Sequence, residues 1–149
     1  MTQQISRHDP RLAAWSAFLR AHARVVRELE RELQAEQRMA LTDYDVLVQL
    51  ANAGERRLRM SELADRLLLS RSGATRLVDR LVAQGLIERR TCDDDRRGQW
   101  ASLTDAGYER LRQASPTHLR GVAEHFLDRL SADELAALER AFTRLDDEA

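Results

Sequence analysis

Two short helices separated by a tight turn are the most constraining feature of this sequence. Ser61 is a good N-cap for the first helix, which is expected to run to about Leu67. After a Leu-Leu-Ser turn, apolar residues at three- and four-residue steps predict a second helix over Arg71–Gln84, and Gly85 ends it. The leucines that the first helix and the turn are expected to present inward are Leu63, Leu67 and Leu68.

Strand signals surround these helices. Leu86–Arg90 and Gln99–Leu103 alternate well enough to predict two strands joined by a polar loop. Upstream, a helix is expected to begin at Thr42 and to end at Gly54, and Arg57–Met60 can add a short third strand.

Long amphipathic helices are predicted on both sides of this region. The first covers Arg11–Gln34. On the other side, Thr104 caps a helix to about Leu130 that Pro116 should kink or interrupt, and Ser131 opens a last helix with a capping box. The predicted fold is mainly α (α+β), a winged helix-turn-helix flanked by terminal helices.

The domain assignment follows from this order. Residues 42–103 form the winged helix-turn-helix unit, with the recognition helix at about 71–84 and the wing at about 86–103. The apolar stripes of 11–34 and 104–147 need a partner surface, which a second copy in a two-fold homodimer supplies. A monomeric bundle of the two ends is the alternative.

Composition narrows the class of protein. The 149 residues carry a net charge of −1, yet residues 55–100 hold 11 arginines against 8 acidic residues. This local excess is typical of a surface that meets a phosphate backbone. Cys92 is the single cysteine, and neither a signal peptide nor a membrane span is visible, so a cytoplasmic protein without membrane contact is expected.

The helix 71–84 separates its side chains by chemistry. One side is apolar and should pack inward, and the other sides carry hydroxyls and guanidinium groups near the N-terminal end, where the helix dipole is positive. Such groups reach phosphate oxygens and base edges of double-stranded DNA. An ordinary solvated helix face is the alternative. The expected DNA-binding residues here are Ser70, Arg71, Ser72, Thr75, Arg76 and Arg80.

The predicted hairpin loop carries charges of both signs. Three aspartates precede Arg96 and Arg97, and Asp95 can orient Arg97 so that a guanidinium lies at the loop tip. A lone arginine on a β-ribbon can enter the narrow minor groove of DNA. A flexible, charge-balanced turn is the alternative.

These segments together resemble the MarR (multiple antibiotic resistance regulator) family. Residues 95–107, Asp-Arg-Arg-Gly-Gln-Trp-Ala-Ser-Leu-Thr-Asp-Ala-Gly, are similar to its wing signature, Asp-x-Arg followed by a strand ending Leu-Thr-x-x-Gly. Residues 60–67 and 72–81 look like its paired helices. The resemblance implies a transcriptional regulator, in most members a repressor, that binds a pseudo-palindromic promoter site as a dimer.

Residue roles follow from the same resemblance. It assigns Arg97 to the minor groove and Asp95 to holding Arg97, and it places the N-terminal part of the recognition helix in the major groove. Gly73 departs from the Ser, Thr or Pro that is commoner at that turn.

Many family members release DNA when a small, often aromatic and anionic, effector binds between their domains. Candidates for such a cleft are Trp15 and His22 on the first helix, with Asp65 and Arg76 as polar partners like those of a urate-binding subgroup. On an apolar stripe, Trp15 is otherwise a core residue.

Other activities find little support in the sequence. The aspartates beside Cys92 disfavour its thiolate and so a redox switch, and His118 and His125 lack a clustered ligand set for a metal. No catalytic motif is present, so neither an enzyme nor a cofactor is expected. A helical module that binds other proteins through the same fold remains the alternative function.

We predict that Arg97→Ala lowers the affinity for the chain's own promoter duplex, because one guanidinium–DNA contact is lost, and that binding of the unsubstituted chain weakens steeply with salt. Fluorescence anisotropy at several salt concentrations measures both effects. Equal affinity for the upstream region and for a random duplex at physiological salt would contradict the regulator hypothesis.

Overall fold

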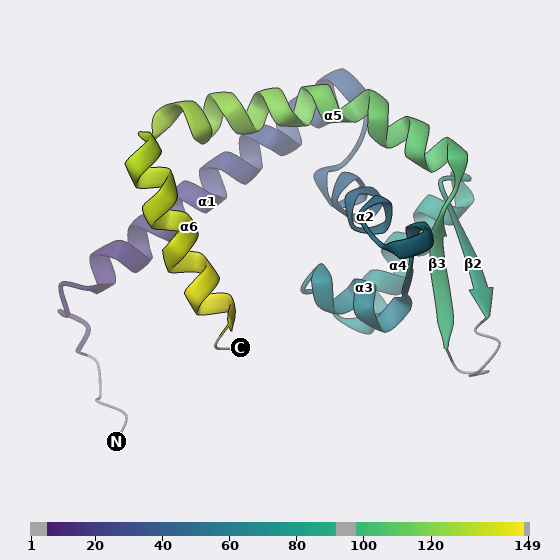
Figure 1. The fold of residues 1–149 in the computed structure, drawn as a ribbon, viewed down its shortest axis with the longest axis horizontal. Helices are drawn as coiled ribbons and strands as arrows, with labels where there is room; N and C mark the ends of the chain where they lie inside the picture. Colours follow the sequence, from purple (N-terminus) through teal and green to yellow (C-terminus); the bar gives the residue numbers. More distant parts are fainter. Residues whose placement is uncertain (1–5, 92–97, 148–149) are drawn as a thin grey trace. The chain divides into compact units, whose positions relative to one another are not determined.

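The chain divides into two compact units, one of residues 32–118 and one of residues 1–31 and 119–149 (Figure 1). The computed structural model describes residues 6–91 and 98–147. Helices dominate and the strands form one small sheet, which agrees with the predicted fold class. In chain order the elements are α1 (Leu12–Glu32), the π-helix η1 (Leu33–Gln37), α2 (Leu41–Ala51), the 3₁₀ turn η2 (Gly54–Arg56), β1 (Arg57–Arg59), α3 (Met60–Arg66), α4 (Arg71–Ala83), β2 (Ile87–Thr91), β3 (Gln99–Leu103), α5 (Asp105–His125), the 3₁₀ turn η3 (Leu127–Arg129) and α6 (Ala132–Asp147).

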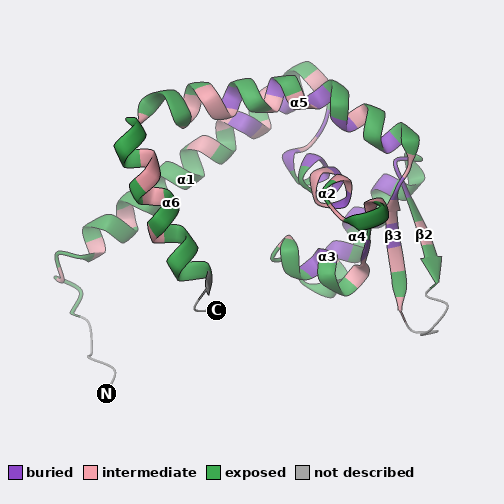
Figure 2. Cartoon of the chain, in the orientation of Figure 1, coloured by how far each residue is buried: buried purple, intermediate pink, exposed green. Residues whose placement is uncertain are grey.

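The sheet belongs to the unit of residues 32–118 and is antiparallel, with strand order β1-β3-β2. Leu58 pairs with Ala101 and Ile87 with Leu103, and all four are buried. Because side chains alternate along a strand, the opposite face carries Trp100 and Ser102 of β3. Figure 2 shows buried residues gathered in this unit, while α1 and α6 are mostly exposed or half-buried.

Helix α4 follows its sequence signals closely. The Ser70 hydroxyl accepts a hydrogen bond from the Gly73 amide at 3.1 Å, so it caps the helix as Ser does at this position. Gly85, just past the helix, has a φ of +73°, a backbone conformation that favours glycine. The apolar stripe is buried as expected, and it consists of Ala74, Leu77, Val78 and Leu81.

Two helices begin earlier than predicted, α2 by one residue and α3 by two. Helix α2 starts at Leu41, and no side chain caps it at Ala40, so Thr42 lies inside its first turn. Helix α3 starts at Met60, and the Arg59 amide donates to Glu62 Oε2 at 3.0 Å. The carboxylate of Glu62 satisfies an amide at the helix start, and Ser61 is therefore not the N-cap.

The expectation that Leu68 faces inward is wrong. Its side chain is 93% exposed, and its φ of +54° lies in the left-handed region. The tight turn between α3 and α4 requires this backbone conformation, which directs the side chain to solvent. Leu63 is fully buried as predicted, while Leu67 is half-buried.

Pro116 does not interrupt α5, which continues from Asp105 to His125. A proline removes one backbone donor, and the surrounding helical hydrogen bonds can persist. The Ser115 hydroxyl donates to the Leu111 carbonyl at 2.8 Å in the same turn. The helix ends before Leu130, and η3 follows it.

In the other unit, α1 and α6 meet through aromatic rings. Phe18 and Phe142 have ring centroids 5.5 Å apart. The predicted capping box at the start of α6 is confirmed, because the Ser131 amide donates to Glu134 Oε2 at 2.8 Å and the Glu134 amide donates back to Ser131 Oγ at 3.3 Å.

The start of α5 is tied to the end of α4 by a small hydrogen-bonded junction. The Thr104 hydroxyl accepts from the Gly107 amide at 2.9 Å and donates to the Gly85 carbonyl at 2.8 Å. A Cβ atom on Gly107 would lie 2.1 Å from the Leu86 carbonyl oxygen. Only glycine lets α5 approach the Leu86 backbone this closely, which explains the Leu-Thr-x-x-Gly pattern in physical terms.

We predict that Gly107→Ala lowers the free energy of unfolding by about 2 kcal/mol, because backbone must move to admit the methyl group. Urea denaturation followed by circular dichroism measures the change. Gly54→Ala is the matched control, since nothing lies within 4 Å of its Cβ position. Equal stability of the two variants would contradict the close approach.

Candidate nucleic-acid interface

The first turns of α4 present the predicted polar side chains to solvent. Ser72, Thr75 and Arg76 are exposed, as is Arg71 at the first helical position. Ser70 is also exposed, but its hydroxyl is engaged as the cap and lies 3.2 Å from Ser72 Oγ. The exposed amide end of a helix attracts anions, and Arg71 and Arg76 add positive charge to it.

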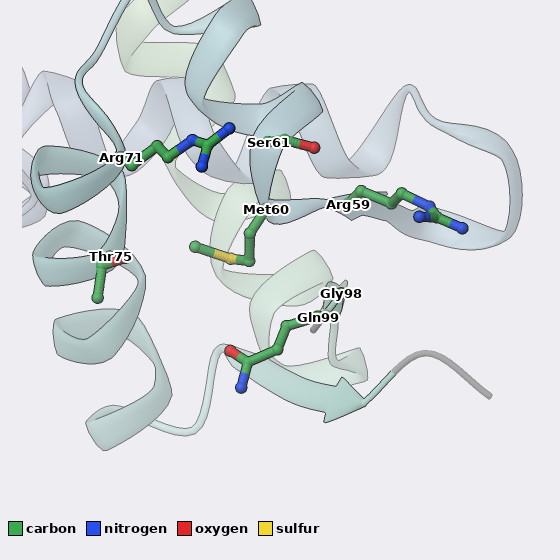
Figure 3. Close-up of a pocket in the computed structure, with 7 residues that line it drawn as sticks. All are labelled: Arg59, Met60, Ser61, Arg71, Thr75, Gly98 and Gln99. Carbon is green, nitrogen blue, oxygen red and sulfur yellow. The ribbon is translucent and has the colours of Figure 1, made fainter. Parts of the chain in front are cut away.

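A hollow of about 330 Å³ lies beside these turns (Figure 3). It brings the start of α3, the first half of α4 and the end of the β-hairpin to one place. In Figure 3 the Met60 side chain lies between Arg71 and Gln99, while the Arg59 guanidinium points away from them. The hollow thus joins a helix and a hairpin in one surface. It is lined by Arg59, Met60, Ser61, Arg71, Thr75, Gly98 and Gln99.

Arg80 has a different place from the other predicted contact residues. Its guanidinium forms an ion pair with Asp43 of α2, whose side chain is only 11% exposed. Asp43 is a buried acid in need of a partner, and Arg80 supplies it. The sequence pattern showed Arg80 on a polar face of α4 but gave no sign of this contact.

Arg89 on β2 is a residue that sequence analysis missed. One of its terminal nitrogens donates to the Thr75 carbonyl at 3.1 Å and lies 3.0 Å from Asp79 Oδ1, and the other donates to Gln99 Oε1 at 3.4 Å. Its phase on the strand could have revealed it, because Arg89 shares a face with buried Ile87.

Several predicted residues lie outside the part of the chain that the structure describes. These are Asp95, Arg96, Arg97 and the single cysteine, Cys92. Their roles at the wing remain predictions from the sequence.

The effector candidates fall in separate units. Trp15 is 57% exposed on α1, and His22 lines an apolar groove formed by α1, α6 and Phe126. Asp65 is exposed on α3 in the unit of residues 32–118, so a shared cleft stays a prediction.

His118, which the sequence did not support as a metal ligand together with His125, has its ring packed on Tyr44, with centroids 4.3 Å apart. Burial lowers the pKa of His118 from its usual value, which favours the neutral ring at this packed position.

Comparison with known proteins identifies the fold and the family. Residues 39–98 match the sequence profile of the MarR family. The structure superposes on Sco3205 from Streptomyces coelicolor, a MarR family regulator solved in complex with DNA, with a TM-score of 0.91 and 32% identity over 99% of this chain and 92% of that one. The chain belongs to the MarR family. AbsC, another MarR regulator from Streptomyces coelicolor, has a TM-score of 0.87 and 31% identity over 99% of this chain and 97% of its own.

Curated MarR-type relatives match over shorter stretches. The repressor MprA of Escherichia coli is 40% identical over 75 residues, which are 50% of this chain and 43% of MprA. The repressor YetL of Bacillus subtilis is 33% identical over 88 residues, 57% of this chain and 53% of its own. The chain therefore spans about half the length of these relatives. Among the described residues, no helix is long and apolar enough to cross a membrane.

We predict that Arg80→Ala lowers the free energy of unfolding by about 1–2 kcal/mol, because Asp43 is left without its partner in a mostly buried position. Arg76→Ala, one turn earlier on an exposed face, should change it by less than about 0.5 kcal/mol. Urea unfolding of both variants makes the comparison. Equal losses would show that the ion pair does not support the fold.

Proposed function

We propose that this MarR-family chain is a dimeric repressor that binds a pseudo-palindromic promoter duplex and releases it when a small, aromatic, anionic effector binds. The observation that carries the proposal is the set of exposed hydroxyl and guanidinium groups on the first turns of α4, beside a hollow that the hairpin also lines. Sco3205, a relative whose structure matches 99% of this chain, is known in complex with DNA.

The chemistry of α4 supports the major groove as its place. Arg71 and Arg76 can pair with phosphates or with guanine edges, and Thr75 can contact either kind of group. The buried stripe on the opposite side of α4 keeps these residues exposed. The hairpin end at Gly98 and Gln99 leads into the loop whose Arg97 is assigned to the minor groove by sequence alone.

The apolar surface of α1 and α6 supports a dimer. Large side chains remain open to solvent in the single chain, and three of them, Phe18, Val26 and Phe142, line an apolar groove of about 480 Å³. Monomeric proteins rarely expose contiguous apolar surface of this kind. A second copy is the partner that we propose for the exposed side chains around the groove, because a pseudo-palindromic site needs two copies related by a two-fold axis. The exposed residues include Trp15, Phe18, Leu19, Val26, Phe142 and Leu145.

The same groove supports an effector site. His22 is the polar side chain in an otherwise apolar lining that includes Phe18 and Phe142, and Trp15 stands 6.0 Å from Phe18 by ring centroids. An aromatic acid can stack on such rings and place its carboxylate near a histidine. Occupation of this groove would act on the surface that we assign to the dimer.

The test is titration of the chain against its own upstream duplex and against a random duplex of equal length. We expect two chains per bound site and a strong preference for the upstream duplex. Arg71→Ala should weaken binding about tenfold and reduce the slope of log affinity against log salt by about one, because one phosphate contact is lost. Arg112→Ala, exposed on α5 and paired with Glu109 at 3.0 Å, is the matched control.

Each part of the proposal has its own contrary result. No preference for any promoter region would contradict the regulator, and one chain per site would contradict the dimer. A panel of aromatic acids, urate among them, tests the effector by release of bound duplex and by thermal stabilisation. Failure of every acid in both assays would remove the effector from the proposal.

A further inference from the structure

We infer that Arg89 is a positioning residue that fixes the β-hairpin relative to the recognition helix, so that the two can enter adjacent grooves of one duplex. The inference rests on the proposed DNA binding and adds a residue that does not itself contact DNA. Its basis is the set of two hydrogen-bond acceptors and one ion-pair partner that a single guanidinium brings together from α4 and β3.

The strand that carries Arg89 depends on such a link. β2 is an edge strand, since the order is β1-β3-β2, and its ladder of hydrogen bonds reaches only β3. β3 is also paired with β1, so within the hairpin only the outer strand β2 lacks a second ladder, and such an edge strand can twist. Arg89 opposes this motion, because its guanidinium reaches out of the sheet to the Thr75 carbonyl and the Asp79 carboxylate on α4.

The partners lie where the two DNA-facing parts begin. Thr75 lines the hollow on the first turns of α4, and Gln99 lines it next to Gly98, at the point where the described hairpin continues into the loop. A guanidinium in contact with both therefore couples the helix turn proposed for the major groove to the ribbon that leads to the minor groove.

Arginine is the residue type that this position needs. The side chain is 24% exposed, and its planar fork has enough donors to serve a carbonyl, a carboxylate and an amide oxygen together. A lysine ammonium can replace the ion pair with Asp79 but cannot span all three oxygens. Arg90, the next residue, lies on the opposite face, is exposed, and pairs with Glu88 at 3.1 Å within its own strand.

The test uses dimethyl sulfate, which methylates guanine N7 in the major groove and adenine N3 in the minor groove, so one reagent reports on both. The unsubstituted chain is bound at saturation to the promoter duplex that it selects. Three variants are bound to the same duplex in the same way: Arg89→Gln, Arg89→Lys and Arg90→Gln. For Arg89→Gln we expect guanine N7 protection to persist, adenine N3 protection to be lost, and affinity to fall about tenfold. Arg89→Lys should be intermediate, and Arg90→Gln should match the unsubstituted chain.

The outcomes separate positioning from simple stability. If Arg89→Gln and Arg89→Lys both lose guanine N7 and adenine N3 protection in parallel, and their urea midpoints fall, Arg89 serves the fold alone. That result would overturn the inference. Retention of both protections at unchanged affinity would overturn it as well. If the unsubstituted chain protects no promoter duplex, the proposed function fails first, and that result is distinct from either of these.

Discussion

The rest of the unit of residues 32–118 depends on the burial of the apolar stripe of α4. Val78 and Leu81 have no exposed surface, and Ala74 and Leu77 are nearly as buried. Each large side chain in such a stripe contributes about 1.5–3 kcal/mol through apolar burial. Because this stripe determines how the helix is rotated about its axis, it also determines which residues of α4 remain exposed for a partner.

Much of this arrangement could be predicted because its signals are local. The Ser70 cap, the stop at Gly85 and the alternation of Gln99–Leu103 each act within a few residues, and each is present in the structure. Helix starts are harder to predict where several neighbouring residues can satisfy the first amides of the helix. Glu62, which follows Ser61 by one residue, satisfies the Arg59 amide, so α3 begins at Met60, two residues before the start that a Ser61 cap predicts.

The contacts that could not be predicted join residues far apart in the sequence. Arg80 and Asp43 are separated by 37 positions, and no periodicity links them. Leu68 has the spacing of an inward-facing residue, but the left-handed backbone of the turn directs it to solvent. Arg89 shares a strand face with buried Ile87, but only the fold shows its partners on α4, a carbonyl and a carboxylate.

These ion pairs change how the arginine-rich segment of residues 55–100 is interpreted. Its local excess of arginines predicted a surface that meets a phosphate backbone, yet several of the guanidinium groups are matched by carboxylates within the unit. Arg71 and Arg76 have no carboxylate partner among these pairs, and they lie at the exposed start of α4, where the helix dipole has the same sign. Positive charge at one end of the helix favours docking of a duplex in one orientation. The pairs include Arg57–Glu55, Arg80–Asp43, Arg89–Asp79 and Arg90–Glu88.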